Sequence, residues 1–317
     1  MSSSFRPNLW VSMLCAAACL LFSQQAQAED DFFEPTGLGM GGAVRILGVD
    51  SSAIRLNPAA MVGEPTYLSS LSYSYYPRER GHIFSSGAYD SRTSNFALGT
   101  NYSVRNFEPP FDPQADTLWY PVSEDASLRD KRTFHRWELA AAYAFLGRRI
   151  NVGLSGRVLR REYELREDTM KFTMDSGVVF YPLPFLGLGV SSQNMIPTGD
   201  TLYPTRLSTG LGLRLPPVLK VAIDVVFDLT SASKPLTDIH AGAELRIMGL
   251  VSIRGGYYSE GRFTQNYVTW GVGLDSERVR ISFAMRIEAG NLDRNLRDDI
   301  TADGNRILNS VGIDMKF

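Results

Sequence analysis

The chain has 317 residues and a nearly balanced charge, with 32 lysines and arginines against 34 aspartates and glutamates. This length suits one large all-β domain or two ordinary domains, and the slight acidic excess gives no reason to expect a nucleic acid as a partner. Both cysteines lie within the first 28 residues, so disulfide bonds cannot hold the remainder together.

Residues 1–28 have the pattern of a secretory signal peptide. Arg6 precedes a nearly continuous apolar run over residues 10–22, and Ala26-Gln27-Ala28 matches a small-residue cleavage site. The run is too short to cross a membrane as a helix, and no longer apolar run follows it. We therefore expect an exported chain without a transmembrane helix.

Residues 29–65 form the second predicted region. Its centre, from Gly37 to Met61, reads GLGMGGAVRILGVDSSAIRLNPAAM and lacks the alternation of a strand. We predict one short helix here, capped by Asp50 and the serines after it and ended by Asn57-Pro58. A small segment of this kind ahead of many strands predicts a plug threaded into a barrel. The residues expected to form and gate the plug are Gly37, Gly39, Gly42, Asp50, Ser52, Asn57 and Pro58.

Gly37, Gly39 and Gly42 also have the G-x-G-x-x-G spacing of a dinucleotide-binding loop. That loop needs a buried strand directly before it, and no strand is predicted there. We interpret the glycines as positions of close packing and unusual backbone angles.

Residues 66–317 consist of segments in which apolar residues alternate with polar or small ones, which is the period of a β-strand. Most of the fourteen predicted strands have nine to twelve residues, the length that crosses an outer membrane at a tilt of ~45°. Strands of soluble sandwiches are usually shorter. The predicted strands are 66–76, 82–90, 95–105, 135–145, 150–163, 171–181, 186–194, 206–214, 218–228, 237–248, 251–259, 267–274, 279–288 and 307–317.

The connections between these strands alternate in length. Six turns have four residues or fewer, and the seven loops between them have five or more, the longest being 106–134 and 289–306. Short inner turns and long outer loops are typical of an outer-membrane barrel. The alternating final strand, which ends at Phe317, resembles the C-terminal signal that barrel assembly machinery recognises. We therefore expect the assembly machinery and outer-membrane lipids as partners.

In four strands, one face is entirely free of charge, as a lipid-facing side requires. Strand 279–288, for example, places Phe283 on one face and both Arg280 and Arg286 on the other. The charged faces would point into the lumen, where two interpretations remain open: a solvated or self-paired lumen, or a polar cage that holds the plug. The predicted lumen network comprises Arg136, Glu138, Arg157, Asp175, Arg206, Asp224, Glu244, Arg246, Arg254, Arg280 and Arg286.

The sequence offers little for catalysis. It has no G-x-S-x-G motif, and its three histidines lack metal-ligand spacing. We therefore expect no enzyme activity, no cofactor and no metal.

The stretch from Gly37 to Met61 resembles the hatch of the long-chain fatty acid transporter family, the FadL type; PorV-type barrels of a secretion system begin similarly. The resemblance rests on Gly37-Leu38-Gly39, Gly41-Gly42-Ala43, Asp50-Ser51-Ser52-Ala53 and Asn57-Pro58-Ala59.

The resemblance implies an all-β, fourteen-stranded antiparallel outer-membrane β-barrel whose N-terminal hatch plugs the lumen. In such a barrel, hydrophobic molecules enter from outside and leave sideways near an irregularity in the third strand, which here would fall at Gly99 to Asn101. An aromatic residue near the mature N-terminus, matched by Phe32 or Phe33, would lie near the ligand.

We thus expect a barrel in the bacterial outer membrane that transports a hydrophobic or amphipathic small molecule by movement of its plug. The many charges that point into the lumen argue against a fatty acid as the ligand, because a long acyl chain needs an apolar pocket. The sequence does not identify the ligand. The alternative is a barrel that transports nothing and serves as an interaction or assembly platform.

Overall fold

The computed structural model describes residues 33–77, 81–107, 111–112, 117–118, 131–164, 167–199, 203–216, 218–230, 235–261, 265–289 and 307–317. The predicted signal peptide and Phe32 lie outside these residues, as do most of the two longest predicted loops.

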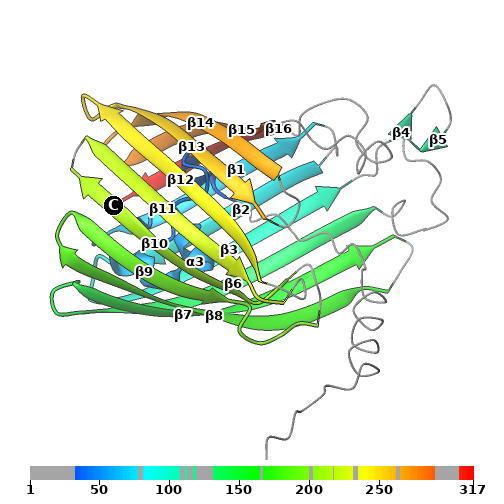
Figure 1. Ribbon diagram of the computed structural model, residues 1–317, viewed down its shortest axis with the longest axis horizontal. Coiled ribbons are helices and arrows are strands. Elements are labelled where there is room, and N and C mark those ends of the chain that lie inside the picture. The colour runs from blue at the N-terminus through cyan, green and yellow to red at the C-terminus, as the bar shows by residue number, and fades with distance from the viewer. Residues whose placement is uncertain are drawn as a thin grey trace, which may run out of the picture.

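Fourteen antiparallel strands form one closed barrel (Figure 1). Neighbours in the chain are neighbours in the sheet, and β1 closes the ring by pairing with β16 from Leu68–Lys316 to Tyr75–Asn309. The predicted fold class is therefore confirmed. The strands are β1 (Tyr67–Tyr76), β2 (Gly81–Asp90), β3 (Phe96–Phe107), β6 (Arg132–Phe145), β7 (Ile150–Tyr163), β8 (Thr169–Leu183), β9 (Leu186–Gln193), β10 (Arg206–Leu215), β11 (Leu219–Asp228), β12 (Leu236–Ile247), β13 (Val251–Glu260), β14 (Gln265–Asp275), β15 (Val279–Ala289) and β16 (Ile307–Lys316).

Each predicted strand corresponds to one observed strand, and the ends differ by at most three residues, as at the start of β6. Two further strands, β4 (Phe111–Asp112) and β5 (Thr117–Leu118), pair within the segment predicted as the first long loop. Strands of two residues carry too few alternations to be recognised in a sequence.

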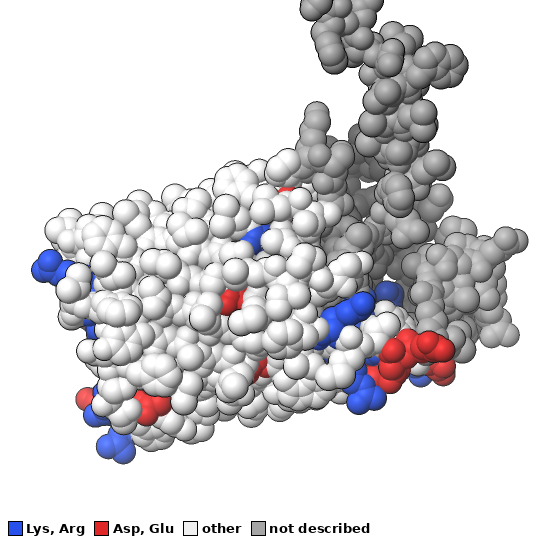
Figure 2. Space-filling model, turned by 90° about the horizontal axis from the view of Figure 1, so that it is seen from below, with Lys and Arg blue, Asp and Glu red and all other residues white. Residues whose placement is uncertain are grey.

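Alternation along the strands separates an apolar exterior from a polar interior. In β15, Ile281 is 47% exposed on the outside, whereas Arg280 and Arg286 are buried inside. Figure 2 shows mostly uncharged side chains over the middle of the wall, with charged side chains gathered toward its two ends. This is the distribution that a lipid-facing surface requires.

The N-terminal segment lies inside the barrel, as the blue ribbon in Figure 1 shows. It contains α2 (Pro35–Gly39), α3 (Ala53–Leu56) and the 3-10 helix η1 (Pro58–Val62), where one helix was predicted. Every residue from Phe33 to Val62 except Gly48 is buried. None of the helices in the described ranges is long or apolar enough to cross a membrane. We call residues 33–63 the plug.

The irregularity expected in the third strand is absent. β3 pairs with β2 and β6 without a break in register across Gly99 to Asn101. A Cβ atom at Gly99 would crowd Met61 and Ile54, so this glycine admits the plug and does not bend the strand. The one register shift that the described pairings show lies between β8 and β9, near Phe180 and Leu183.

Candidate functional site: the plug and the lumen wall

Side chains of the barrel wall bind the backbone of the plug. Most of the plug is irregular, so its carbonyl groups lack helix or sheet partners and need other donors when buried. Donors come from β7, β8, β9, β10, β12, β14, β15 and the turn before β7. The bonds are Thr269 to the carbonyl of Gly39 (3.2 Å), His240 to Gly41 (2.8 Å), Tyr181 to Ile46 (3.0 Å), Arg214 to Leu47 (2.8 Å), Arg280 to Val49 (3.4 Å), Arg157 and Gln193 to Arg55 (3.2 and 3.1 Å), Ser191 to Leu56 (2.9 Å) and Arg148 to Val62 (2.8 Å).

Asp50 organises the interior of the plug. Its Oδ2 accepts a hydrogen bond of 2.9 Å from the backbone amide of Gly37, and its Oδ1 accepts one of 3.0 Å from the amide of Ser52. The predicted helix cap is only partly right: Ser52, the N-cap residue of α3, makes no side-chain cap bond, whereas Asp50 accepts the amide of Ser52 at the start of the helix. The carboxylate also ties the start of α3 to α2, because its second oxygen accepts from an amide thirteen residues earlier.

The predicted end of the helix is confirmed. α3 stops at Leu56, and Asn57 takes an extended conformation with φ of −159°. Pro58 then begins η1, whose first turn is capped by a hydrogen bond of 3.2 Å from the amide of Ala59 to the side chain of Asn57.

Glycines on both surfaces allow the plug to approach the wall closely. Gly42 has a φ of +78°, and a Cβ atom there would overlap the ring of Phe33 and lie 2.8 Å from Nδ1 of His240. Gly37 and Gly39 have ordinary backbone angles, and added Cβ atoms would lie 3.3 Å from Asp50 and 3.2 Å from Arg254. On the wall, added Cβ atoms would overlap plug atoms at Gly153, Gly177, Gly242 and Gly256.

Buried ion pairs of β6, β7 and β8 form one network that contacts the plug. Arg157 of β7 lies 2.9 Å from Glu138 of β6 and also pairs with Asp175 of β8. The same guanidinium donates to the plug at the carbonyl of Arg55. This one arginine thus joins three strands to the plug.

A second network centres on Glu244 of β12. Its carboxylate lies 2.7 Å from Arg254 and 3.5 Å from Lys220, with Arg246 at 3.7 Å. Arg246 also approaches Asp275 at 3.5 Å, which in turn pairs with Arg280. Because Arg280 donates to the plug, this network also reaches the plug.

The remaining predicted lumen residues are buried on the inner face of the wall. Asp224 binds Arg45 of the plug, and Arg286 lies over the ring of Tyr267 with 4.5 Å between the guanidinium carbon and the ring centre. Arg136 and Arg206 are 8% and 9% exposed. The structure thus brings most of the predicted lumen residues together around the plug.

The sequence assigned no role to three charged residues that the structure places in contacts of the plug and the lumen. Arg45 lies in the plug, Arg214 of the wall binds the plug, and Asp275 of the wall pairs with Arg280. The alternation of side chains along β10 and β14 could have shown that Arg214 and Asp275 face the lumen. Nothing local marks Arg45, because its partner lies 179 residues away in the chain.

The ligand candidates are enclosed by other protein groups. Phe33 is 2% exposed and packs edge-on against His240, with 5.8 Å between the ring centres. Asn101 donates a hydrogen bond of 3.0 Å to Glu138. Gly99 faces Met61 of the plug. Their role toward a ligand stays a prediction.

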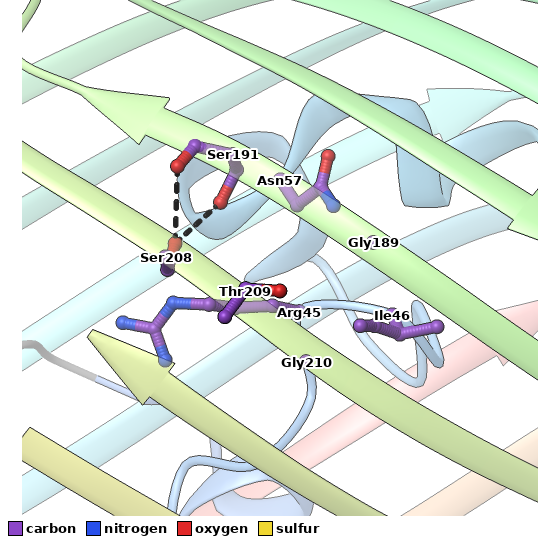
Figure 3. Close-up of a pocket in the computed structure, with 8 residues that line it drawn as sticks. All are labelled: Arg45, Ile46, Asn57, Gly189, Ser191, Ser208, Thr209 and Gly210. Atoms are coloured by element: carbon purple, nitrogen blue, oxygen red, sulfur yellow. Dashed lines mark hydrogen bonds between the residues drawn. The ribbon is translucent and has the colours of Figure 1, made fainter. Parts of the chain in front are cut away.

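A small crevice lies between the plug and the wall. Its empty space is about 120 Å³, below the ~300 Å³ at which pockets for small molecules begin. Figure 3 shows Ser191 and Ser208 hydrogen-bonded across neighbouring strands, with 2.7 Å between their hydroxyl oxygens. The lining residues are Arg45, Ile46, Asn57, Gly189, Ser191, Ser208, Thr209 and Gly210.

A closed ring of fourteen strands with an internal segment bound to its wall defines a plugged β-barrel. No family model matches the sequence. No curated protein matches it either.

Solved structures with the same fold are available for comparison. The toluene transporter TodX of P. putida has a TM-score of 0.57 at 11% identity, over 91% of this chain and 98% of that one. A Pseudomonas aeruginosa FadL homologue has a TM-score of 0.59 at 11% identity, over 89% and 96%. A TodX variant described as a monoaromatic hydrocarbon channel has a TM-score of 0.61 at 10% identity, over 90% and 98%. The chain therefore has the FadL-type fold, and the predicted resemblance is confirmed for the fold.

Proposed function

We propose that this chain is an outer-membrane transporter of hydrophobic or amphipathic small molecules, gated by its plug, and that it is not an enzyme. The fold and the uncharged outer wall support the placement in the outer membrane. Two of the compared structures, a toluene transporter and a monoaromatic hydrocarbon channel, support the class of ligand.

The observation that carries the proposal is the way in which the plug is bound. Wall side chains donate to eight plug carbonyls, whereas the wall strands pair with one another throughout. A net protein hydrogen bond contributes about 0.5–1.5 kcal/mol between neutral groups and about 1.5–3 kcal/mol where the donor is charged, as it is for Arg148, Arg157, Arg214 and Arg280, because water replaces it when it opens. The plug can therefore exchange its contacts for water in steps, while the barrel stays closed.

In the proposed mechanism, a ligand binds near the outer mouth and displaces Phe33 from its site against His240. The start of the plug then shifts, and the ligand leaves inward or through the wall. Lateral exit would require β3 to open near Gly99 to Asn101, where its pairing is continuous in this structure.

A disulfide lock tests the gating. The hydroxyls of Thr36 in the plug and Ser282 in β15 lie 3.3 Å apart, so Thr36→Cys with Ser282→Cys is suited to form a bond between plug and wall. Ser74→Cys with Ser310→Cys is the matched control, because those hydroxyls lie 2.6 Å apart within the wall. Residues after position 28 include no native cysteine that could interfere.

We expect uptake of labelled toluene into vesicles that contain the oxidised plug lock to stop and to return after reduction. The oxidised control should transport like the unmodified protein. Undiminished uptake through the oxidised lock would contradict plug gating.

A sealed barrel that serves as an interaction platform is the second candidate. The charged lumen and the small size of the crevice favour it. It predicts that the unmodified protein and both cysteine variants carry no lipophile in either redox state.

A further inference from the structure

Four basic side chains converge on one carboxylate at the inner end of the lumen. The carboxylate belongs to Glu64, which follows the plug directly and whose side chain is 58% exposed. Each of the four cations occupies the first or second position from the inner end of its strand and faces the lumen. They are Arg214 of β10, Lys220 of β11, Arg280 of β15 and Lys316 of β16, and we call them the basic cluster.

The environment of Glu64 shows that the basic cluster surrounds it. Partial withdrawal from water raises the pKa of the Glu64 carboxyl, but the charges of all four members of the cluster outweigh this effect and hold the pKa below its usual value. The guanidinium of Arg214 is in direct contact, at 2.6 Å from the carboxylate. Two pairs of strands on different parts of the ring thus direct their positive charge at one point.

Positive charge is in excess at this end of the lumen. We counted the described inward residues among the five positions nearest the inner end of each strand from β10 to β16, together with Glu64. They carry six cationic groups against four carboxylates, an excess of two positive charges. The groups beyond Glu64 and the basic cluster are Arg246, Arg254, Glu244, Asp275 and Asp314. An excess of one sign in a lumen with protein walls attracts ions of the opposite sign.

Two lysines of the basic cluster have donors to spare. In the described part of the chain, the ammonium group of Lys316 forms no hydrogen bond or ion pair, although the charges of Asp314 and Glu64 act on it. Lys220 is 19% exposed, and its ion pair is a long one, 3.5 Å from Glu244. Since each ammonium carries three N–H donors, this end of the lumen can bind further acceptor oxygens.

The position of Glu64 favours a ligand with more charge than a carboxylate. Glu64 is tethered to the site, so its effective concentration there is roughly millimolar or higher, and a carboxylate ligand would gain no charge by replacing it. A phosphate monoester carries about −1.5 to −2 charges at pH 7 and three strong acceptor oxygens. It would supply more negative charge than Glu64 removes, and both arginine and lysine bind phosphate well.

Two members of the basic cluster also hold the plug. Arg214 binds Glu64 through Nη1, while its Nη2 donates a hydrogen bond of 2.8 Å to the carbonyl of Leu47. Arg280 donates one of 3.4 Å to the carbonyl of Val49. A phosphate that drew these guanidinium groups toward itself would take donors from the plug. Binding at the cluster is therefore coupled to the hold on residues 47–49.

We propose that the inner mouth of the barrel is a phosphate-binding site, which Glu64 occupies while the plug is in place. The phosphate group can come from the head of an amphipathic molecule or from free phosphate. Its arrival on a transported amphipath rests on the proposed function, whereas the site itself does not.

Calorimetric titration of the purified full chain tests the site, in an uncharged detergent at constant ionic strength. The three probes are hexyl phosphate, hexanoate and inorganic phosphate. Glu64→Gln removes the competing carboxylate, and Lys220→Gln with Lys316→Gln removes the two cations that have unused donors. Arg92→Gln is the matched control, because it removes an exposed cation from the inner turn between β2 and β3. Heat-modifiable migration on gels shows whether each variant is folded.

We expect hexyl phosphate to bind more tightly than hexanoate. Glu64→Gln should strengthen its binding about fivefold, because a competing surface ion pair is lost. The double lysine variant should weaken it by about tenfold or more, and Arg92→Gln should leave it unchanged. Weaker binding of inorganic phosphate than of hexyl phosphate would assign the site to amphipaths, and equal binding would assign it to free phosphate.

Three results would overturn the proposal: an affinity that does not change in Glu64→Gln, hexanoate bound as tightly as hexyl phosphate, or equal losses in Arg92→Gln and the double lysine variant. Amide exchange at residues 47–49 should become faster on binding of hexyl phosphate, and unchanged exchange would contradict the coupling to the plug. The titration needs no transport, so its failure and a failure of toluene uptake can be told apart.

Discussion

Arg45 of the plug and Asp224 of β11 meet through two contacts on one carboxylate. The backbone amide of Arg45 donates to Oδ2 at 3.0 Å, and its guanidinium lies 3.8 Å from the same oxygen. Both residues are almost completely buried. An irregular segment is thereby fixed to the wall at one point by its backbone and its charge together.

Replacement of this carboxylate should loosen the middle of the plug. Asp224→Ala leaves the Arg45 amide without its acceptor and should lower the stability of the plugged state by about 2–3 kcal/mol. The measurement is the rate at which a protease cuts the plug in detergent, compared with Asp168→Ala, which removes an exposed acid outside the lumen. Equal protection in both variants would show that Asp224 does not anchor the plug.

Close contact between the plug and the wall should make Gly242 intolerant of a side chain. A Cβ atom there would overlap the backbone of Met40, and overpacking of this kind typically costs about 1–3 kcal/mol. Gly242→Ala should therefore lower the unfolding midpoint in urea and expose the plug to protease. The control is Gly255→Ala on β13, where a Cβ atom meets nothing within 4 Å. If Gly255→Ala destabilised the barrel as much as Gly242→Ala, steric pressure on the plug could not be the cause.

Each strand could be predicted from its own residues, because apolar and polar side chains alternate along it. Arg280, Ile281 and Ser282 show by their order alone which sides face lipid and lumen, and the closed barrel confirms it. The presence of a plug was predictable for a related reason, since the segment around Gly37 to Met61 lacks that alternation.

The details of the plug were not predictable, because its partners are distant in the chain. Asp50 has a local pattern that suits a helix cap, but Gly37 offers an amide that only the folded plug brings near. Gly99 was expected to interrupt β3, whereas the structure uses its small size to admit Met61. The local sequence identifies a residue that can cap a helix or allow close packing. The fold of the barrel and the plug determines which groups that residue contacts.

Glu34 should make the plug sensitive to pH. It lies in the plug, outside the spanning strands, and burial together with the nearby charge of Asp50 raises the pKa of its carboxyl to about 7. Hydrogen bonds from Ser72 and Ser85 and the charge of Arg55 oppose this rise only in part. Because the folded pKa exceeds the unfolded one, the stabilisation is complete below the unfolded value and is lost as pH rises through about 7.

The plug should therefore exchange its amide hydrogens faster at pH 8 than at pH 5, after correction for the intrinsic rate. The difference should reach roughly 3 kcal/mol in opening free energy at residues 35–39. Glu34→Gln cannot ionise and should show nearly the same opening free energy at both pH values. A slope that persists in Glu34→Gln would assign the pH dependence to another group.

Arg157 should be the most costly lumen residue to remove. It holds Glu138 and Asp175, and it also donates to the carbonyl of Arg55, so Arg157→Met leaves two buried carboxylates and a carbonyl without their cation. Loss of one partner from a buried pair costs about 3–5 kcal/mol, whereas replacement of the whole charged group by neutral residues is often tolerated. The triple variant Arg157→Met, Glu138→Gln, Asp175→Asn should thus unfold closer to the unmodified barrel than Arg157→Met does. Heat-modifiable migration on gels, followed against temperature, measures both midpoints. If the triple variant were the less stable of the two, the attraction within this network would exceed the cost of burying it.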